Sequence, residues 1–344
     1  MVYSYSFCKS ILHHPDALIP QPVSNDLLTD RASLLINKLA RLSNNEQHSD
    51  ARRAAELVYK AMQPVSISEL LQSLLRDVKP DKSFDWVDVI AKKLPFLLIL
   101  KGFGCSDKEC DYVVTHIETL VKLLSPQKTT EEINSINNIV DDFFSLSEKL
   151  IARSDCFKDI TDDIKWTELY LCNLIGLLIQ SYDAGWGLLC NSLMQFDKQV
   201  KSINLKEQDI DYFKRSVIET VRFDPPVHLT KRIADADILL DGEAIKKGEN
   251  ILLILAAANV DPDVFNEPLT FDPLRANNSA HITFGAGGHT CLAKYLMIDM
   301  AAEICRYLYS AFDVGIPTQA IEYEPKMNVR LLKRLLITLT DNNL

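Results

Sequence analysis

The chain has 344 residues, of which 47% are hydrophobic and 24% charged, a composition typical of folded globular proteins and not of disordered ones. Its 37 lysine and arginine residues stand against 47 aspartate and glutamate residues, giving a formal net charge of −10. This balance disfavours nucleic acid as a partner, because binding phosphates requires a basic face. No apolar run reaches the length of a membrane span. The eight cysteines show no CxxC pair and the N-terminus shows no secretory signal, which predicts reduced thiols in a cytoplasmic protein.

The first two thirds of the chain are predicted to be helical. Apolar residues recur every three or four positions in 51–62 and 66–76, and Ser66 with Glu69 forms a capping-box pattern at the start of the second segment. Two longer periodic segments, about 130–153 and 165–198, follow. The second contains the nearly continuous apolar run LYLCNLIGLLIQSY, which predicts a helix buried on most of its sides.

The pattern changes after residue 222, where short β-type stretches appear at 233–245 and 249–260. Asp241-Gly242 is a hairpin-turn signal. A proline- and asparagine-rich loop, about 261–290, leads to a last helix that begins near Cys291, and the C-terminal residues alternate like a strand. The sequence therefore predicts a single, mainly α domain over residues 1–344 with a small β subdomain, its β-rich meander and glycine loop lying at about 223–290.

Three of the 11 glycines fall within four positions of the segment Phe284–Ala293, FGAGGHTCLA. Glycine permits positive φ and lets a backbone approach a flat object closely. Cys291 is expected at a helix start, where the partial positive charge stabilises a thiolate, and His289 can donate a proton to an anion. A phosphate-binding turn is the competing interpretation, but the lysine and hydroxyl of GxxxxGK[ST] are absent.

This segment resembles the haem-binding loop of the cytochrome P450 family, F-x-x-G-x-[RH]-x-C-x-[GA]. The positions that match are Phe284, Gly287, His289, Cys291 and Ala293. The resemblance implies a cytochrome P450 fold and a haem b cofactor with the Cys291 thiolate as the iron ligand. It also implies that Phe284 and Gly285 contact the cofactor.

Matches upstream strengthen the resemblance. Glu219 and Arg222 form an ExxR pair on one helix face, a common pattern when it stands alone. It is followed by Pro226–Arg232, similar to the family's segment that runs along the haem and ends in a propionate-binding arginine, here Arg232. The run from Ala257 to Arg275 then resembles the family's AN-x-D-P…F…P…F-D-P-x-R. The resemblance implies that Arg275 joins Glu219 and Arg222 in a buried ion network that specifies the meander's conformation.

A further match lies near the N-terminus. His48 and Arg52 resemble the family's H-x-x-x-R at the start of a helix that crosses the haem. With Arg232 and His289 they make four candidate partners for the two haem propionates, through charge-assisted hydrogen bonds.

The long apolar helix carries a departure from the family pattern. Gln180–Gly185 aligns with [AG]-G-x-[DE]-T-[TS], so the acid, Asp183, is present but the hydroxyl residue is replaced by Ala184. Ser181, three residues earlier, could partly restore a hydroxyl. Three interpretations stay open: a monooxygenase with an altered proton relay, atypical haem-thiolate chemistry (peroxide use, coupling or dehydration), and a non-catalytic haem-binding protein. Simple drift at Ala184 is a fourth explanation of the substitution.

By the same resemblance, Tyr182, Trp186, Val227 and His228 are expected to face a small organic substrate of a biosynthetic or tailoring pathway, although Trp186 could equally belong to the core. A ferredoxin or flavodoxin is the expected redox partner, received by a basic patch of Arg53, Lys60 and Lys294.

The chain is short for the family at its N-terminus. Residues 2–18 resemble the helix that follows the family's first two strands, so we expect part of the N-terminal strands to be lacking. The sheet edge would then be open or closed another way, and a partner or a dimer could cover it.

Overall fold

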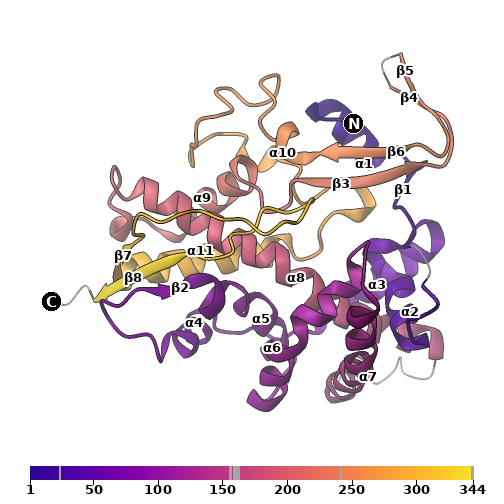
Figure 1. The fold of residues 1–344 in the computed structure, drawn as a ribbon. Coiled ribbons are helices and arrows are strands. Elements are labelled where there is room, and N and C mark those ends of the chain that lie inside the picture. Colours follow the sequence, from indigo (N-terminus) through magenta and orange to yellow (C-terminus); the bar gives the residue numbers. More distant parts are fainter. Residues whose placement is uncertain (23–24, 155–156, 158–162, 241, 342–344) are drawn as a thin grey trace. The chain divides into compact units, whose positions relative to one another are not determined.

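The computed structural model describes residues 1–22, 25–154, 157, 163–240 and 242–341 (Figure 1). The chain divides into two compact units. Unit 1 comprises Met1–Ala17, Ser66–Pro95 and Asp183–Leu344, and unit 2 comprises Leu18–Val65 and Phe96–Tyr182. The prediction of a mainly α chain with small sheets is confirmed, whereas the single domain over residues 1–344 stays a prediction. Each unit is described below by itself.

Unit 2 is helical. Two of its helices begin with complete capping boxes, Ser106 with Glu109 and Thr129 with Glu132, which satisfy the first backbone N–H groups. Its elements are α2 (Asp30–Lys38), η1 (Ala40–Leu42), α3 (Asn45–Ala61), most of α5 (Leu94–Gly102), α6 (Asp107–Val121), η3 (Lys122–Leu124), α7 (Thr130–Arg153) and the first half of α8 (Ile164–Gln199).

Unit 1 combines helices with short strands, and α9 runs alongside α11 within it (Figure 1). Its helical elements are α1 (Tyr5–His13), α4 (Ile67–Leu75), η2 (Val87–Ala91), the second half of α8, η5 (Leu205–Glu207), α9 (Ile210–Phe223), α10 (Leu255–Ala258), η6 (Asn278–Ala280), η7 (Gly287–His289) and α11 (Lys294–Ala311). Its strands are β1 (Ala17–Leu18, which ends at the unit boundary), β2 (Phe84–Asp85), β3 (Leu229–Ala234), β4 (Ile238–Leu240), β5 (Glu243–Ile245), β6 (Asn250–Ile254), β7 (Phe312–Gly315) and β8 (Leu336–Asp341).

The strands form two three-stranded sheets and a hairpin, ordered β1-β3-β6, β2-β8-β7 and β4-β5. Strands β3 and β6 are antiparallel, with Leu229 opposite Ile254. The far edge of β6 is partly covered by the chain's own N-terminus, because the Val2 N–H donates to the Leu252 carbonyl at 2.8 Å and the Ile254 N–H donates to the Val2 carbonyl at 2.8 Å. Of the two alternatives expected for this edge, open or closed another way, the second is found locally, through Val2.

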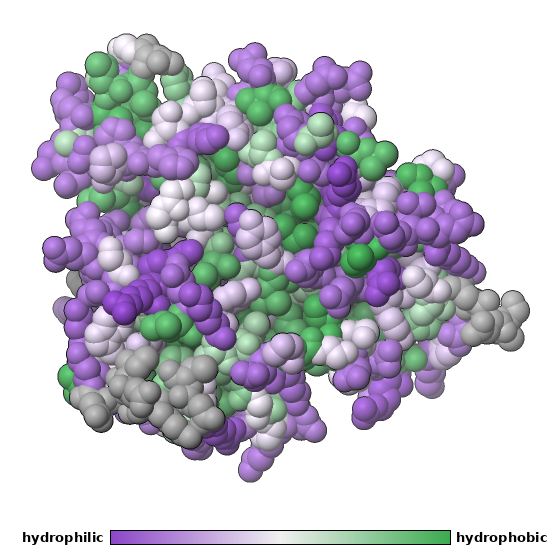
Figure 2. All heavy atoms as spheres, turned by 180° about the vertical axis from the view of Figure 1, so that it is seen from behind, coloured by the Kyte–Doolittle hydropathy of each residue, from purple (hydrophilic) through white to green (hydrophobic). Residues whose placement is uncertain are grey.

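The helix predicted over 165–198 is α8, and its apolar run is buried as expected. The face of the molecule seen in Figure 2 is covered largely by hydrophilic side chains, with hydrophobic ones visible between them. No helix among the described residues is both long enough and apolar enough to cross a membrane. Hydrophobic residues of α8 with at most 2% exposure are Leu169, Tyr170, Cys172, Leu174, Ile175, Leu178, Ile179, Leu188, Leu189, Cys190, Leu193 and Phe196.

Some boundaries differ from the sequence prediction. Helix α11 begins at Lys294, three residues after Cys291, because the glycine loop continues through a turn before the helix forms. The Ser66 side chain caps α4 by accepting the Glu69 N–H at 3.3 Å, which is the Ser66 half of the predicted capping box. Strands β4 and β5 pair with Leu240 opposite Glu243, so the hairpin is present, while Asp241 of its predicted turn lies outside the described residues.

Candidate functional site

The glycine segment of unit 1 forms a closed loop that ends at Cys291. The Cys291 N–H donates to the Phe284 carbonyl at 2.8 Å, and the Thr290 hydroxyl donates to the Gly287 carbonyl at 2.8 Å. Gly285 and Gly287 have φ of +73° and +68°, a region that costs residues with a Cβ roughly 1–2 kcal/mol. The backbone conformation of the loop therefore requires glycine at both positions.

Gly287 is also constrained by the N-terminal helix. A Cβ at this position would lie 2.8 Å from the Leu12 carbonyl oxygen, in the last turn of α1. Helix α1 is itself held in place, because the Tyr5 N–H donates to the Asp261 carboxylate at 2.8 Å and the Tyr5 hydroxyl donates to the Ala280 carbonyl at 2.8 Å. The glycine loop that ends at Cys291 thus packs directly on the α1 backbone.

Cys291 differs from the other cysteines in its exposure. Of the seven cysteines that the structure describes, six are buried and Cys291 is partly exposed. Burial raises the pKa of Cys8, Cys105 and Cys172 to about 12, so these thiols stay protonated and make poor ligands or nucleophiles. Cys291 is therefore the described thiol that an incoming group can reach.

Arg232 on β3 is a buried cation. Its side chain is 4% exposed, and its Nη1 donates to the Thr230 hydroxyl at 3.2 Å and to the Lys231 carbonyl at 2.8 Å. Within the described parts of the chain no carboxylate lies within ion-pair distance of it, and burial lowers its pKa to about 10. A buried charge without a counter-ion is unfavourable. Its surroundings fit an external carboxylate, as a haem propionate would supply.

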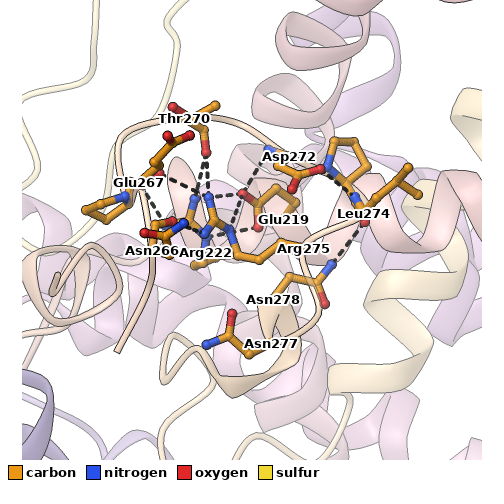
Figure 3. A network of polar contacts seen from close by, with 12 residues as sticks. Glu219, Arg222, Asn266, Glu267, Thr270, Asp272, Leu274, Arg275, Asn277 and Asn278 are labelled. Atoms are coloured by element: carbon orange, nitrogen blue, oxygen red, sulfur yellow. Dashed lines mark hydrogen bonds and ion pairs between the residues drawn. The ribbon is translucent and has the colours of Figure 1, made fainter. Parts of the chain in front are cut away.

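Glu219, Arg222 and Arg275 meet in a buried ion network (Figure 3). Arg222 donates from Nη2 and Nε to the two Glu219 oxygens at 2.6 and 2.9 Å. Arg275 Nε donates to the Glu219 carboxylate at 3.3 Å, and the Asp272 N–H donates to the same carboxylate at 3.1 Å. Glu219 and Arg222 have no exposed side-chain surface, so their charges are compensated by partners within the protein and not by water.

The same two arginines hold the meander by its backbone. Arg222 donates to the carbonyls of Asn259 at 3.0 Å and Pro268 at 2.9 Å. Segment 266–270 curls around the guanidinium of Arg275, which donates to three carbonyls (Figure 3), those of Asn266, Glu267 and Thr270. The meander is therefore wrapped around two fixed cations.

A second chain of hydrogen bonds links the meander to the glycine loop. The Asn259 side chain donates to the Thr283 hydroxyl at 2.6 Å and accepts the Ile282 N–H at 2.8 Å. Thr283 in turn donates to the Val221 carbonyl on α9 at 2.8 Å. The ExxR helix, the meander and the residues just before Phe284 thus form one hydrogen-bonded framework. The sequence pattern contained Asn259, but nothing in it identified Thr283 as its partner.

The acid of α8 is paired. Both oxygens of the Asp183 carboxylate accept hydrogen bonds from Lys326 Nζ at 2.8 Å. The Ser181 hydroxyl donates to the Leu178 carbonyl of its own helix at 2.9 Å, and Ala184 contributes no polar group. Sequence reasoning missed Lys326, because a contact between residues 143 positions apart leaves no local pattern.

The two aromatic candidates of α8 are buried. The Tyr182 hydroxyl donates to Glu118 at 2.6 Å within unit 2. Trp186 is 3% exposed, and the Lys92 ammonium lies 4.9 Å from its ring centroid within unit 1. This environment fits the core alternative for Trp186.

Val227 and His228 are tied to the C-terminal segment. Val227 forms an isolated antiparallel bridge with Val329, and the His228 N–H donates to the Asn328 carbonyl at 2.9 Å. Burial lowers the pKa of His228, and Arg330 lowers it further, so the imidazole is neutral at pH 7.

His48 and Arg52 lie one turn apart on α3 of unit 2. His48 Nδ1 is 2.9 Å from the Ala40 carbonyl oxygen, and Arg52 Nε donates to Glu56 at 2.8 Å. Arg232, His289 and Cys291 belong to unit 1, where His289 ends the short helix η7. That these residues act together on one cofactor stays a prediction.

His281 was not singled out from the sequence. Its ring centroid lies 5.4 Å from that of Phe284, and its Nδ1 has no hydrogen-bond partner among the described residues. Burial lowers its pKa to about 4, with Lys294 and Arg222 adding to the effect. Its position three residues before Phe284 is the signal that could have drawn attention to it.

The fold and this loop define a class of protein. The cytochrome P450 family model matches residues 195–334, which include the ExxR pair, the meander and Cys291. Relatives and solved structures over almost the whole chain are also cytochromes P450. Residues 195–334 thus match the cytochrome P450 family, whose members are haem-thiolate oxidoreductases, and the cytochrome P450 fold predicted from the sequence is confirmed.

Particular relatives are similar at low identity. The biotin biosynthesis cytochrome P450 of Bacillus subtilis (strain 168) is 24% identical over 335 residues, covering 93% of this chain and 84% of that protein. Cytochrome P450 CYP107DY1 of Priestia megaterium is 26% identical over 268 residues, covering 72% of this chain and 64% of that one.

Two solved structures share the fold. P450BioI in complex with hexadec-9Z-enoic acid ligated acyl carrier protein has a TM-score of 0.82 at 22% identity, covering 98% of this chain and 91% of that chain. CalO2 has a TM-score of 0.83 at 18% identity, covering 99% and 91%.

Proposed function

We propose that this chain binds haem b through Cys291 and oxidises a small organic substrate as a monooxygenase in a biosynthetic or tailoring pathway. The observation that carries the proposal is the glycine loop, which presents the partly exposed cysteine of unit 1 on a rigid framework. Arg232 supports it independently, since a buried cation with no carboxylate within ion-pair distance among the described residues fits a propionate.

Seven residues are proposed to hold the cofactor. The Cys291 thiolate would ligate the iron, and Phe284 and Gly285 would lie against the cofactor. Arg232 would bind a propionate, with His48, Arg52 and His289 as further partners. A bound haem-thiolate supplies oxygen activation, because the thiolate pushes electron density toward the iron. The buried network of Glu219, Arg222 and Arg275 would keep the loop in place during turnover.

Proton supply is where this chain departs from its family. Ala184 has no hydroxyl, and the Ser181 hydroxyl is engaged with Leu178. Asp183 is therefore the proposed proton-handling residue of α8, working through an ordered water or a polar group of the substrate. The same facts favour a second candidate, peroxide-dependent oxidation. Dioxygen requires two electrons and two protons to reach the level of hydrogen peroxide, whereas hydrogen peroxide brings both with it.

The substrate proposal rests on the similar proteins and on the C-terminal segment. One similar structure carries a fatty acyl chain on an acyl carrier protein, and another is in complex with corticosterone, so both contain largely apolar organic molecules. We propose Val227 and His228 as substrate-facing residues. Tyr182 and Trp186, which are buried, are weaker candidates.

A ferredoxin or flavodoxin is the proposed electron donor, received by Arg53, Lys60 and Lys294. A carrier protein that presents the substrate is an alternative small acidic partner. Cytoplasmic location and a dimer stay predictions from the sequence.

Turnover separates the candidate functions. The holoprotein would be incubated with a panel of fatty acids and steroids, once with a ferredoxin, its reductase and NADPH under dioxygen, and once with hydrogen peroxide alone. A monooxygenase yields hydroxylated product in the first arm with one NADPH consumed per product. Product in the peroxide arm alone identifies peroxide-dependent chemistry. Bound haem without product in either arm contradicts both candidates and favours a non-catalytic haem protein.

A further inference from the structure

The last turns of α8 and α11 meet within unit 1, where the ring centroids of Phe196 and Tyr309 lie 5.8 Å apart. A cleft of about 550 Å³ lies at this place, lined by residues 200–206 after α8, by Tyr309 and by residues 312–314 of β7 (Figure 1). Its volume is in the range of small-molecule sites, about 300–1,000 Å³. None of the lining residues is among those proposed to hold the haem.

Tyr309 brings a polar group without a partner to this cleft. It is 3% exposed, and its hydroxyl has no hydrogen-bond partner among the described residues. Burial raises the pKa of Tyr309, and Cys305 and Asp197 raise it further, so the hydroxyl is neutral and can both donate and accept. A buried hydroxyl without a partner is unfavourable, and a ligand that supplies one would remove this cost.

The charges around the cleft are of both signs. Lys206 Nζ donates to the Asp313 carboxylate at 2.9 Å. Burial raises the pKa of Asp197, one turn before the cleft, whereas Lys201 and Lys198 lower it. An anion would meet these carboxylates and the partial negative charge at the C-terminal ends of two helices, and a cation would meet the lysines. The surroundings therefore favour a neutral ligand.

We propose that this cleft binds a neutral, apolar molecule with one hydroxyl group, which Tyr309 recognises through a hydrogen bond. A hydroxyl accepts from Tyr309 and can also donate to Asp197 or to a carbonyl at the end of α8, whereas a ketone can only accept. The apolar body would lie against Val200, Ile203 and Phe312. The Val200 side chain is 43% exposed and would turn outward to admit the ligand.

2-Naphthol, which is neutral at pH 7, is the probe. Amide hydrogen exchange at residues 200–206, followed as 2-naphthol is added to the purified protein, reports on this cleft and not on binding near Cys291. We expect exchange to slow and to saturate. Tyr309→Phe should weaken the affinity about 2- to 12-fold, the range of one neutral hydrogen bond. 2-Methylnaphthalene, with a methyl group in place of the hydroxyl, should bind both proteins equally.

Two further variants keep the test sharp. Tyr295→Phe removes a hydroxyl from the same helix at a position that is 67% exposed, and it should leave the affinity unchanged. Val200→Trp places a large ring at the cleft and should abolish the slowing of exchange. Tyr309→Phe itself should be as stable as the wild type or more stable in thermal unfolding, because it removes a buried hydroxyl without a partner.

The ligand class is tested with two charged probes of the same body. 2-Naphthoate and 2-naphthylmethylammonium should both bind more weakly than 2-naphthol. Tighter binding of either one overturns the proposal, as does an unchanged affinity for 2-naphthol in Tyr309→Phe. No slowing of exchange at residues 200–206 up to the solubility limit of 2-naphthol also overturns it, and is the result expected of a cleft that holds only water. The proposed function is tested separately, by the spectrum of the reduced carbon monoxide complex.

Discussion

Replacing Glu219 with glutamine tests the buried network. The substitution keeps the shape of the side chain but removes the charge that two buried guanidinium groups share. Glu219 accepts four hydrogen bonds, two from Arg222, one from Arg275 and one from the Asp272 N–H. A glutamine would also turn an N–H₂ group toward an arginine that can only donate.

The size of the expected stability loss follows from the burial of Glu219 and its two arginine partners. Removing one partner of a buried ion pair costs about 3–5 kcal/mol, because the other charge is left uncompensated. With two arginines affected and none of the carboxylate exposed, we expect the upper half of that range. This is a large share of a typical folding free energy of about 5–15 kcal/mol.

Urea unfolding followed by far-ultraviolet circular dichroism would measure the change. Glu322→Gln is the control, since Glu322 pairs with Lys333 while 69% exposed and should change stability by less than about 1 kcal/mol. A loss below about 1 kcal/mol in Glu219→Gln would refute the reasoning, because it would mean that the two arginines are not dependent on this carboxylate.

Three other changes probe the loop and its surroundings. Arg232→Met replaces a buried cation that has no carboxylate partner among the described residues. The haem-free chain should be as stable or more stable, and haem affinity measured by titration should fall at least about 10-fold. Lower stability of the haem-free chain with unchanged affinity would contradict the propionate role. Gly287→Ala should destabilise more than Gly248→Ala in thermal unfolding, because both glycines have positive φ but only a Cβ at Gly287 meets a backbone atom, at 2.8 Å; equal losses would exclude the packing on α1. His281 has a folded pKa of about 4, below the ordinary 6.5, so the unfolded chain binds more protons between these values and stability should fall as pH drops from 6.5 to 4. Urea unfolding at pH 7 and pH 4.5 should show a smaller acid loss in His281→Gln than in wild type, by about 2 kcal/mol, and an identical loss would show that His281 does not contribute.

Local spacing carried much of what the sequence could predict. The buried helix α8 follows from a continuous apolar run, and the cap of α4 follows from Ser66 and Glu69 standing three apart. The cap depends on a contact within one helical turn, where sequence separation and spatial distance correspond, and the burial of α8 follows from the apolar composition of its own residues.

Contacts between distant segments were out of reach. Lys326 reaches Asp183 across 143 residues, and Leu12 approaches Gly287 through its backbone carbonyl, which carries no residue-specific signal. That no described carboxylate lies beside Arg232 is likewise a property of the folded surroundings. The helix start at Lys294 shifted from the expected Cys291 because the glycine loop and its turn use the intervening residues.

The absorption spectrum of the reduced protein with carbon monoxide tests the central claim most directly, that Cys291 is the thiolate ligand of a bound haem. Wild type should show the red-shifted Soret band of thiolate ligation, Cys291→Ala should lose it, and Cys305→Ala, which removes a fully buried thiol of α11, should keep it. A wild-type protein without bound haem, or a Cys291→Ala variant that retains the band, would contradict the account.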